Sequence, residues 1–434
     1  MWPVKTVLEM LHGDRFLKAM SALYPKGQME AQKARYIDAV KSFVELYGAD
    51  REITFISAPG RTEIGGNHTD HQQGRVLAAS VDLDIICVVS KNDDNTVRIK
   101  SKGYRQDIVK LNDLEKKEAE TDKAISLIRG VLSRFRQLGY NIGGFDAYTT
   151  SNVLKGSGLS SSAAFEVALG TILSRVFNGG RVDAVQIAQI GKYAENVYFG
   201  KPSGLMDQMA SSVGGFVAID FKDPENPVIE PVRFDFAASN HTLCIVDTKG
   251  NHSDLTPEYS AIPAEMESVA AFFGKDKLRE VDEQEFYGKL PEIRGKLGDR
   301  PALRAMHFFG ENERVFHEAQ ALREGNFDKF KRLVVESGRS SSDMLQNVFA
   351  VKEPNEQGVS VGLALSEILL SPKGAWRVHG GGFAGTIQAF VPNEMLEHYR
   401  AYMEKVFGAG SCYELAIRPF GGVEVDTGLT QEGR

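Results

Sequence analysis

Large apolar side chains recur at helical spacing in the first fifty residues. One stripe runs from Val7 to Met20 and a second from Tyr36 to Leu46, and a proline-containing turn at residues 24–27 separates them. Spacing of three to four residues places side chains on one face of a helix. The pattern therefore predicts a helical lead-in over residues 1–50, to which we assign packing and no chemistry.

Beyond residue 50, short β-rich runs alternate with amphipathic stretches of helical length. Strands are predicted at residues 53–57, 85–89, 96–100, 145–150, 242–247, 376–378, 386–390 and 413–417, the second and third joined as a hairpin. Helices are predicted at residues 124–138, 163–173, 182–199, 205–212, 257–272, 278–296, 301–323, 327–346, 357–371 and 395–407. This mixture indicates an α+β fold.

The length of the chain indicates more than one domain. A chain of 434 residues exceeds one ordinary hydrophobic core. Residues 222–240 are polar and contain prolines, which is typical of a domain junction. We expect an N-terminal domain at residues 51–235 and a C-terminal domain at residues 236–434.

Composition narrows the class of protein. Hydrophobic residues make up 42% of the chain and charged residues 25%, and the net charge is −7, which disfavours a nucleic-acid surface. The sequence shows no apolar run of about 18 residues and no signal-peptide pattern. We expect a cytoplasmic protein with no membrane or nucleic-acid partner, and a monomer by default. Cys87, Cys244 and Cys412 lie in or near apolar runs and should be buried free thiols.

Glycine and serine residues gather in one turn that suits an anion. Residues 155–164 read Lys-Gly-Ser-Gly-Leu-Ser-Ser-Ser-Ala-Ala, between a predicted strand and a predicted helix. A glycine loop that leads into a helix offers unpaired backbone N–H groups to phosphate oxygens. A plain loop with a serine N-cap is the alternative. No Gly-Lys-Ser/Thr closes the loop, which excludes a Walker A motif.

An upstream stretch combines a cation with groups that suit a sugar. Residues 58–74 read Ala-Pro-Gly-Arg-Thr-Glu-Ile-Gly-Gly-Asn-His-Thr-Asp-His-Gln-Gln-Gly, which we expect to be a loop. Arg61 can present a fixed cation to an anion. Asn67, His68 and Asp70 can exchange hydrogen bonds with sugar hydroxyls, which both donate and accept. A polar surface loop is the alternative.

Two further stretches hold candidate chemistry. Residues 201–208 read Lys-Pro-Ser-Gly-Leu-Met-Asp-Gln at a break between helices, so that Asp207 follows Glu195 by twelve residues. Acidic residues at helix ends are otherwise caps or solvated groups. Residues 378–386 carry His379 and three consecutive glycines between strands, which indicates either close backbone approach to a ligand or a sharp turn.

These four stretches, in this order, resemble the motifs of the GHMP small-molecule kinases, and the first and third resemble the galactokinase branch. The resemblance covers the chain from about residue 53 onward. It implies a two-domain α+β kinase fold with the active site in the cleft between the domains. It also implies transfer of a phosphoryl group from ATP, with Mg²⁺, to a sugar that becomes a sugar 1-phosphate.

The resemblance assigns roles to individual residues. Asp207, which receives the proton of the sugar's anomeric hydroxyl, and Arg61, near the transferred phosphate, match catalytic residues. Sugar contacts are implied for Asn67, His68, Asp70, Gly204 and, after the segment at residues 249–253, Tyr259. ATP contacts are implied for Gly156, Ser157, Gly158, Leu159, Ser160, Ser161 and Ser162. Ser162 and Glu195 match the Mg²⁺ ligands, and two hard oxygens suffice for an ion that keeps several waters. For Tyr259, simple packing is the alternative.

Two positions depart from the galactokinase pattern. Asn67 and His71 stand where those kinases carry glutamate and tyrosine. In those kinases the glutamate contacts the C6 hydroxyl of the sugar. Because its charge is lost here, the resemblance does not determine which sugar is the substrate. D-galactose is the first expectation, and N-acetylgalactosamine, L-arabinose and galacturonate are alternatives. A catalytically inactive sugar sensor is a further alternative, against which the intact run at residues 160–164 counts.

Overall fold

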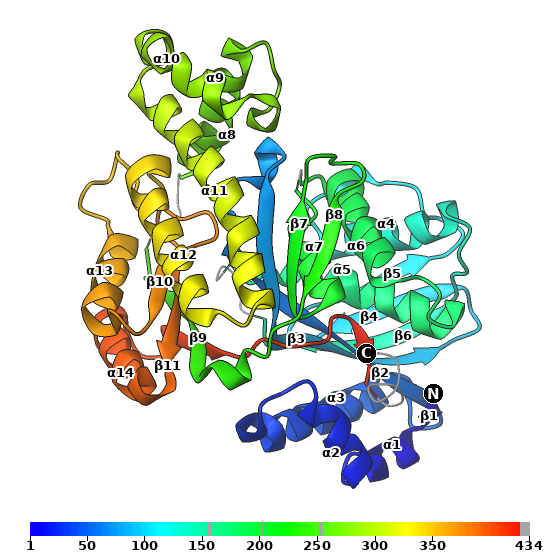
Figure 1. Ribbon diagram of the computed structural model, residues 1–434. Helices are drawn as coiled ribbons and strands as arrows, with labels where there is room; N and C mark the ends of the chain where they lie inside the picture. The colour runs from blue at the N-terminus through cyan, green and yellow to red at the C-terminus, as the bar shows by residue number, and fades with distance from the viewer. Residues whose placement is uncertain (154–157, 202, 251–254, 426–434) are drawn as a thin grey trace.

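The computed structural model describes residues 1–153, 158–201, 203–250 and 255–425 (Figure 1). The lead-in forms β1 (Trp2–Pro3), α1 (Val4–Met10), α2 (Asp14–Ser21) and α3 (Met29–Tyr47). Its helices lie against one face of the first sheet, where Phe16, Tyr36 and Phe43 share a core with Phe55 and Val88. The predicted helical lead-in is therefore confirmed.

The first sheet contains most strands from the N-terminal half of the chain. They are β2 (Glu52–Gly65), β3 (Arg75–Lys91), β4 (Thr96–Ser101), β5 (Gln106–Lys110), β6 (Phe145–Ser151), β7 (Phe216–Asp220) and β8 (Val228–Val232). The order within the described residues is β1-β2-β3-β6-β4-β5, and β7 pairs with β3 and β8. Strand β3 therefore pairs with β6 and β7 as well as with β2, so that strands distant in sequence lie side by side.

The predicted hairpin of residues 85–89 and 96–100 is wrong. Strand β6 lies between β3 and β4, antiparallel to β3 and parallel to β4. The turn at residues 92–95 reverses the chain, as its composition indicates, but turn chemistry does not choose the pairing partner. Strand β6 therefore forms hydrogen bonds with both β3 and β4.

The loop predicted for the first motif is partly strand. Strand β2 continues to Gly65, with irregular register at Pro59/Arg61 and at Glu63/Gly65. Bulges of this kind bend a strand and re-aim its side chains without ending the pairing. Arg61 is therefore held by a paired strand rather than by a free loop.

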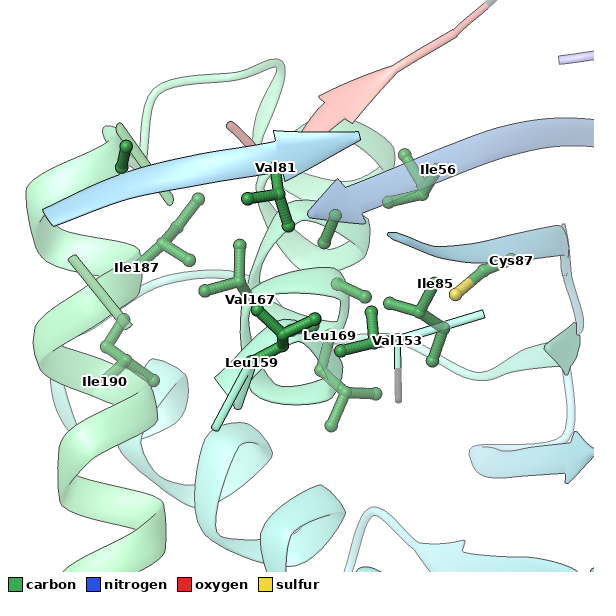
Figure 2. Close-up of a cluster of buried hydrophobic side chains, with 14 of the residues drawn as sticks. Ile56, Val81, Ile85, Cys87, Val153, Leu159, Val167, Leu169, Ile187 and Ile190 are labelled. Atoms are coloured by element: carbon green, nitrogen blue, oxygen red, sulfur yellow. The ribbon is translucent and has the colours of Figure 1, made fainter. Parts of the chain in front are cut away.

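Four helices cover the other face of the first sheet: α4 (Ala124–Gln137), α5 (Ser161–Ile172), α6 (Ala184–Tyr193) and α7 (Met206–Val213). Val167 and Leu169 of α5 and Ile187 of α6 pack beneath strand residues such as Val81 (Figure 2). Val153, before the glycine- and serine-rich loop, and Leu159, within it, belong to the same cluster. The core therefore holds the chain at both of these residues.

The second sheet has the antiparallel order β10-β11-β9-β12. Its strands are β9 (His241–Asp247), β10 (Ala375–His379), β11 (Thr386–Pro392) and β12 (Cys412–Leu415). The helices of this half are α8 (Thr256–Phe272), α9 (Glu283–Gly288), α10 (Leu290–Leu297), α11 (Asp299–Arg323), α12 (Phe327–Ser340), α13 (Gly358–Leu370) and α14 (Leu396–Phe407). The single helix predicted at residues 278–296 is divided, because Pro291 starts a new helix after Gly288.

The two sheets are linked by the end of the chain. Ile417 bridges to Val81, and β13 (Val423–Glu424) pairs with β2 of the first sheet. The domain limits at residues 235 and 236 stay a prediction. The crossing segment belongs to the expected C-terminal domain by its place in the sequence, but it pairs with the first sheet.

The three cysteines are buried and free, as expected. None of the helices within the described ranges is long and apolar enough to span a membrane.

Candidate active site

Three segments of the first half bring Arg61, Ser160 and Asp207 together. Arg61 lies on β2 and Asp207 in the first turn of α7, 146 residues away. The Arg61 Nε donates to Asp207 Oδ1 at 2.7 Å, and an Arg61 terminal nitrogen lies 2.6 Å from the same oxygen. The Ser160 hydroxyl donates to Asp207 Oδ2 at 2.6 Å. The two expected catalytic residues are therefore direct partners.

This arrangement keeps Asp207 ionised. Burial raises the pKa of Asp207, but the charge of Arg61 and the hydrogen bonds from Ser160 and Arg61 outweigh that effect and lower the pKa overall. The side chain is still 25% exposed, so a ligand can reach it. Asp207 can thus act as a hydrogen-bond acceptor at neutral pH.

The expected phosphate loop ends directly beside this pair. Gly156 and Ser157 lie outside the described residues. Gly158 has a φ of +74°, and its carbonyl accepts from Arg61. The Leu159 carbonyl accepts from the Arg61 backbone N–H at 3.1 Å. The backbone of this loop is therefore tied to the strand that carries Arg61.

Helix α5 begins at Ser161 without a side-chain cap. The Ser160 hydroxyl donates to Asp207 instead of accepting from the helix, so the simple N-cap alternative does not describe it. Ser161 and Ser162 occupy the first turn, where backbone N–H groups lack helical partners. The start of α5 therefore offers the donors that bind phosphate oxygens.

Ser162 and Glu195 supply neighbouring oxygens. The Ser162 hydroxyl lies 3.3 Å from Glu195 Oε1, and the Lys201 ammonium pairs with the same oxygen at 3.0 Å. Glu195 is 2% exposed. Within the described ranges, no group of three or more His, Cys, Asp or Glu side chains is placed to hold a metal ion. The pair nevertheless fits Mg²⁺, because both donors are hard oxygens and the position already attracts a cation.

The third motif lies next to the phosphate loop. His379, at the end of β10, hydrogen-bonds through Nε2 with Thr62 at 3.0 Å and through Nδ1 with Thr386 at 2.9 Å. A Cβ on Gly158 would lie 3.0 Å from the His379 ring. Burial lowers the pKa of His379 to about 3, so its ring is neutral. A buried imidazole from the second sheet therefore supports the loop.

His68 and Tyr259 both attach to the glycines of the third motif. The His68 Nε2 donates to the Gly381 carbonyl at 3.1 Å, and burial lowers the pKa of His68 to about 4. The Tyr259 hydroxyl donates to the Gly382 carbonyl at 3.1 Å. Its ring also packs edge-on against Phe383. Both the packing and the sugar-contact interpretation of Tyr259 fit this position.

Asp70 and Gly204 lie side by side. A Cβ on Gly204 would be 3.1 Å from Asp70 Oδ2, so glycine leaves this carboxylate accessible. Burial and then the charge of Asp207 raise the pKa of Asp70, although a backbone hydrogen bond from His71 opposes this. The charge of Asp207 therefore acts on Asp70, which places Asp70 near the expected catalytic pair.

The structure does not agree with the expected sugar contact of Asn67. This side chain is fully buried. Its Nδ2 donates to Glu63 Oε1 at 2.9 Å and to the Gly380 carbonyl at 2.7 Å, and its Oδ1 accepts from Asn347 at 2.8 Å. Partners from β2 and from the second half of the chain therefore use both amide protons. Asn67 is a brace between the two halves rather than an available sugar ligand.

Two residues behind the site were not predicted. The Gln208 amide donates to Glu166 Oε2 and to Glu195 Oε2, both at 2.8 Å. Burial and then the charge of Glu195 raise the pKa of Glu166 well above its usual value. Glu166 follows Ser162 by four residues, which places both on one face of α5 and could have indicated it. Gln208 ends the motif at residues 201–208, but the sequence assigns no role to it.

Comparison with known proteins agrees with this site. The family described as GHMP kinases N terminal domain matches residues 126–215, and the galactokinase galactose-binding signature matches residues 41–91. The galactokinase of Streptomyces coelicolor is 32% identical, over 85% of this chain and 92% of that protein. The galactokinase of Actinobacillus pleuropneumoniae serotype 3 is 30% identical, over 83% and 91%.

Solved structures show the same fold. Galactokinase of Lactococcus lactis, complexed with galactose, has a TM-score of 0.73 at 24% identity and covers 88% of this chain and 98% of that one. Mevalonate kinase of Methanococcus jannaschii has a TM-score of 0.59 at 13% identity, over 85% and 98%. The α+β kinase fold expected from the motifs is confirmed. Together with relatives at least 30% identical over most of their length, these findings place the chain in the galactokinase branch of the GHMP kinases.

Proposed function

We propose that the protein transfers the γ-phosphoryl group of ATP to the C1 hydroxyl of a sugar, with D-galactose as the first candidate. The observation that carries the proposal is the contact of Arg61 with both Asp207 and the loop at Gly158. One cation therefore touches the expected proton acceptor and the expected phosphate site. Asp70 lies beside Gly204, which precedes Asp207 by three residues. His68 contacts Gly381 of the third motif.

The reaction joins the C1 oxygen to the γ-phosphorus and breaks the bond from that phosphorus to the β–γ bridging oxygen. The hydroxyl proton passes to Asp207. Phosphoryl transfer has a loose transition state, so positioning and charge stabilisation matter more than a strong base. An ionised Asp207 of lowered pKa suits that demand, because it accepts a hydrogen bond from the hydroxyl before any proton moves.

The remaining residues would bind and orient the substrates. Arg61 would share its hydrogen bonds between Asp207 and the transferred phosphoryl group. The first turn of α5 would bind phosphate oxygens. Mg²⁺, when bound, would neutralise phosphate charge, and Ser162 and Glu195 would hold it. Each proposed role matches an atom that can donate or accept as required.

An ADP-release assay over hexoses, N-acetylhexosamines, pentoses and uronic acids tests this function, with the product identified by ³¹P NMR. We expect a sugar 1-phosphate, and galactose as the best substrate among galactose, N-acetylgalactosamine, L-arabinose and galacturonate. The Asp207→Asn variant is the control for sugar-independent ATP hydrolysis. Binding of a sugar and of Mg·ATP without ADP release would instead support the inactive sensor.

A further inference from the structure

The helical lead-in contains none of the proposed catalytic or binding residues, but its contacts reach the strands next to the phosphate loop. The matched families begin at residue 41, so most of the lead-in lies outside them. We propose that the lead-in positions the phosphate loop, and that Arg35 on α3 is the residue through which it does so. This inference rests on the proposed function of the loop as the ATP site.

Asp84 on β3 is the point at which the lead-in meets the sheet. Its side chain is fully buried. Oδ1 accepts from Arg35 at 2.6 Å, and Oδ2 accepts from the Tyr24 hydroxyl at 2.5 Å and from Arg418 at 3.1 Å. Burial raises the pKa of Asp84, but the charges of Arg35 and Arg418 outweigh it and lower the pKa overall. A buried anion thus holds groups from both ends of the chain.

Arg35 also reaches the strand that leads into the loop. One terminal nitrogen of its guanidinium donates to the Asp84 carbonyl and to the Thr150 carbonyl, both at 2.8 Å. Thr150 is the residue before the end of β6. A single side chain from the lead-in therefore joins β3 to β6 at the point where the chain leaves the sheet.

The next contact continues this connection into the loop. The Asn152 side chain accepts from the Asp84 backbone N–H at 2.6 Å, and the Asn152 N–H donates to the Asp84 carbonyl at 3.1 Å. That carbonyl is the one that Arg35 binds. Regular pairing of β6 with β3 ends at Ser151. Beyond it, Asn152 is held by the backbone of Asp84, which Arg35 also contacts.

The other contacts of the loop show why its direction matters. A Cβ on Gly60 would lie 2.9 Å from the Leu159 carbonyl and 3.0 Å from Val153. Val153 and Leu159 therefore both contact the strand residue before Arg61. A shift at Asn152 would reach its neighbour Val153 and thereby this contact beside Arg61, and misplacement by about 1 Å can cost an enzyme about a hundredfold.

The test compares Arg35→Ala and Arg35→Lys with a matched control, Arg51→Ala. Arg51 donates to Asp146 and to the Lys91 carbonyl, so it makes the same kind of contact at the opposite end of β6. Binding of a non-hydrolysable Mg·ATP analogue and of galactose is measured by calorimetry on the full chain, and unfolding temperature is measured for each variant. Lysine keeps the charge at position 35 but replaces the two guanidinium nitrogens that bind these oxygens with a single nitrogen.

We expect both Arg35 variants to bind the nucleotide about 5- to 20-fold more weakly, with galactose affinity unchanged. Their KM for ATP should rise while the KM for sugar stays constant. Arg51→Ala should lower the unfolding temperature without this loss. Nucleotide affinity within twofold of wild type in Arg35→Lys, or an equal loss in Arg51→Ala, would overturn the inference. A wild-type chain that binds no nucleotide would overturn the proposed function itself, and the inference with it.

Discussion

At the scale of single residues, Asp207 combines its proposed catalytic task with a structural one. Its carboxylate accepts hydrogen bonds from Arg61 and Ser160 while remaining 25% exposed. The lowered pKa means that the negative charge is already present before substrate binds. A substitution that removes the charge of this side chain but keeps its shape can separate the two tasks.

Asp207→Asn should lower kcat by about 10²–10⁴-fold and leave ATP affinity nearly unchanged, because the proton acceptor is lost while the loop stays in place. Steady-state kinetics and nucleotide binding check this. Ser160→Ala, which removes one partner of the carboxylate, is the comparison and should have a smaller effect. A variant that keeps more than half of the wild-type rate would remove Asp207 from the mechanism.

Asn67→Glu is expected to affect stability rather than sugar choice. A glutamate would place a second carboxylate beside buried Glu63 and lose the donors to that residue and to Gly380. The free energy of unfolding should fall by about 3 kcal/mol or more. Urea unfolding measures this loss. The kcat/KM ratios among galactose, L-arabinose and galacturonate should not change, and an altered ratio in a stable variant would restore Asn67 as a sugar contact.

At the scale of elements, Gly158 is the place where the loop meets the second half of the chain. It combines a positive φ with a close approach to the His379 ring. Any side chain there therefore meets two obstacles. One is backbone strain, which occurs wherever a non-glycine residue adopts this conformation, and the other is specific to the loop.

Gly158→Ala should weaken binding of the Mg·ATP analogue by about tenfold, since the added methyl group pushes the loop away from His379. Gly179→Ala is the matched control, because Gly179 has a φ of +60° and open space around its Cβ position. The control should lose about 1 kcal/mol of stability and no nucleotide affinity. Equal affinity losses in both variants would show that strain, rather than the contact, is responsible.

The elements themselves were largely predictable, and their partners were not. Periodicity placed the helices of the lead-in and of the second half, because burial of one face leaves a local pattern. The hairpin prediction failed because a turn determines reversal and not pairing. Similarly, the motifs identified Arg61 and Asp207, but the burial of Asn67 depends on Asn347, 280 residues away, and no local pattern encodes it.

At the scale of the whole molecule, buried neutral histidines should make stability depend on pH. His68 and His379 have pKa values of about 4 and about 3 when folded, below the usual value near 6.5. As the pH falls, the unfolded chain therefore binds protons before the folded one does. Stability should be complete above about pH 6.5 and should fall as the pH drops toward the folded values.

For His379 alone, the expected loss between pH 7 and pH 5 is about 2 kcal/mol. His379→Gln should reduce that loss, although the variant is less stable at pH 7. Urea unfolding at both pH values measures the difference, and substitution of the exposed His398 is the control. Buried Glu166 and Glu318, whose pKa values burial raises, act in the opposite direction in every variant and cancel in the comparison. If His379→Gln loses as much free energy of unfolding between pH 7 and pH 5 as the wild type does, His379 is not the group that titrates.

The crossing of residues 416–425 to the first sheet has a consequence for protein synthesis. Arg418 and strand β13 complete the surroundings of Asp84 and β2, yet they are among the last described residues. A nascent chain has made almost all of its first sheet long before it has made these residues. Until then, Asp84 has only one of its two arginines. The first half of the molecule therefore reaches its final state only after residues 416–425 have been made.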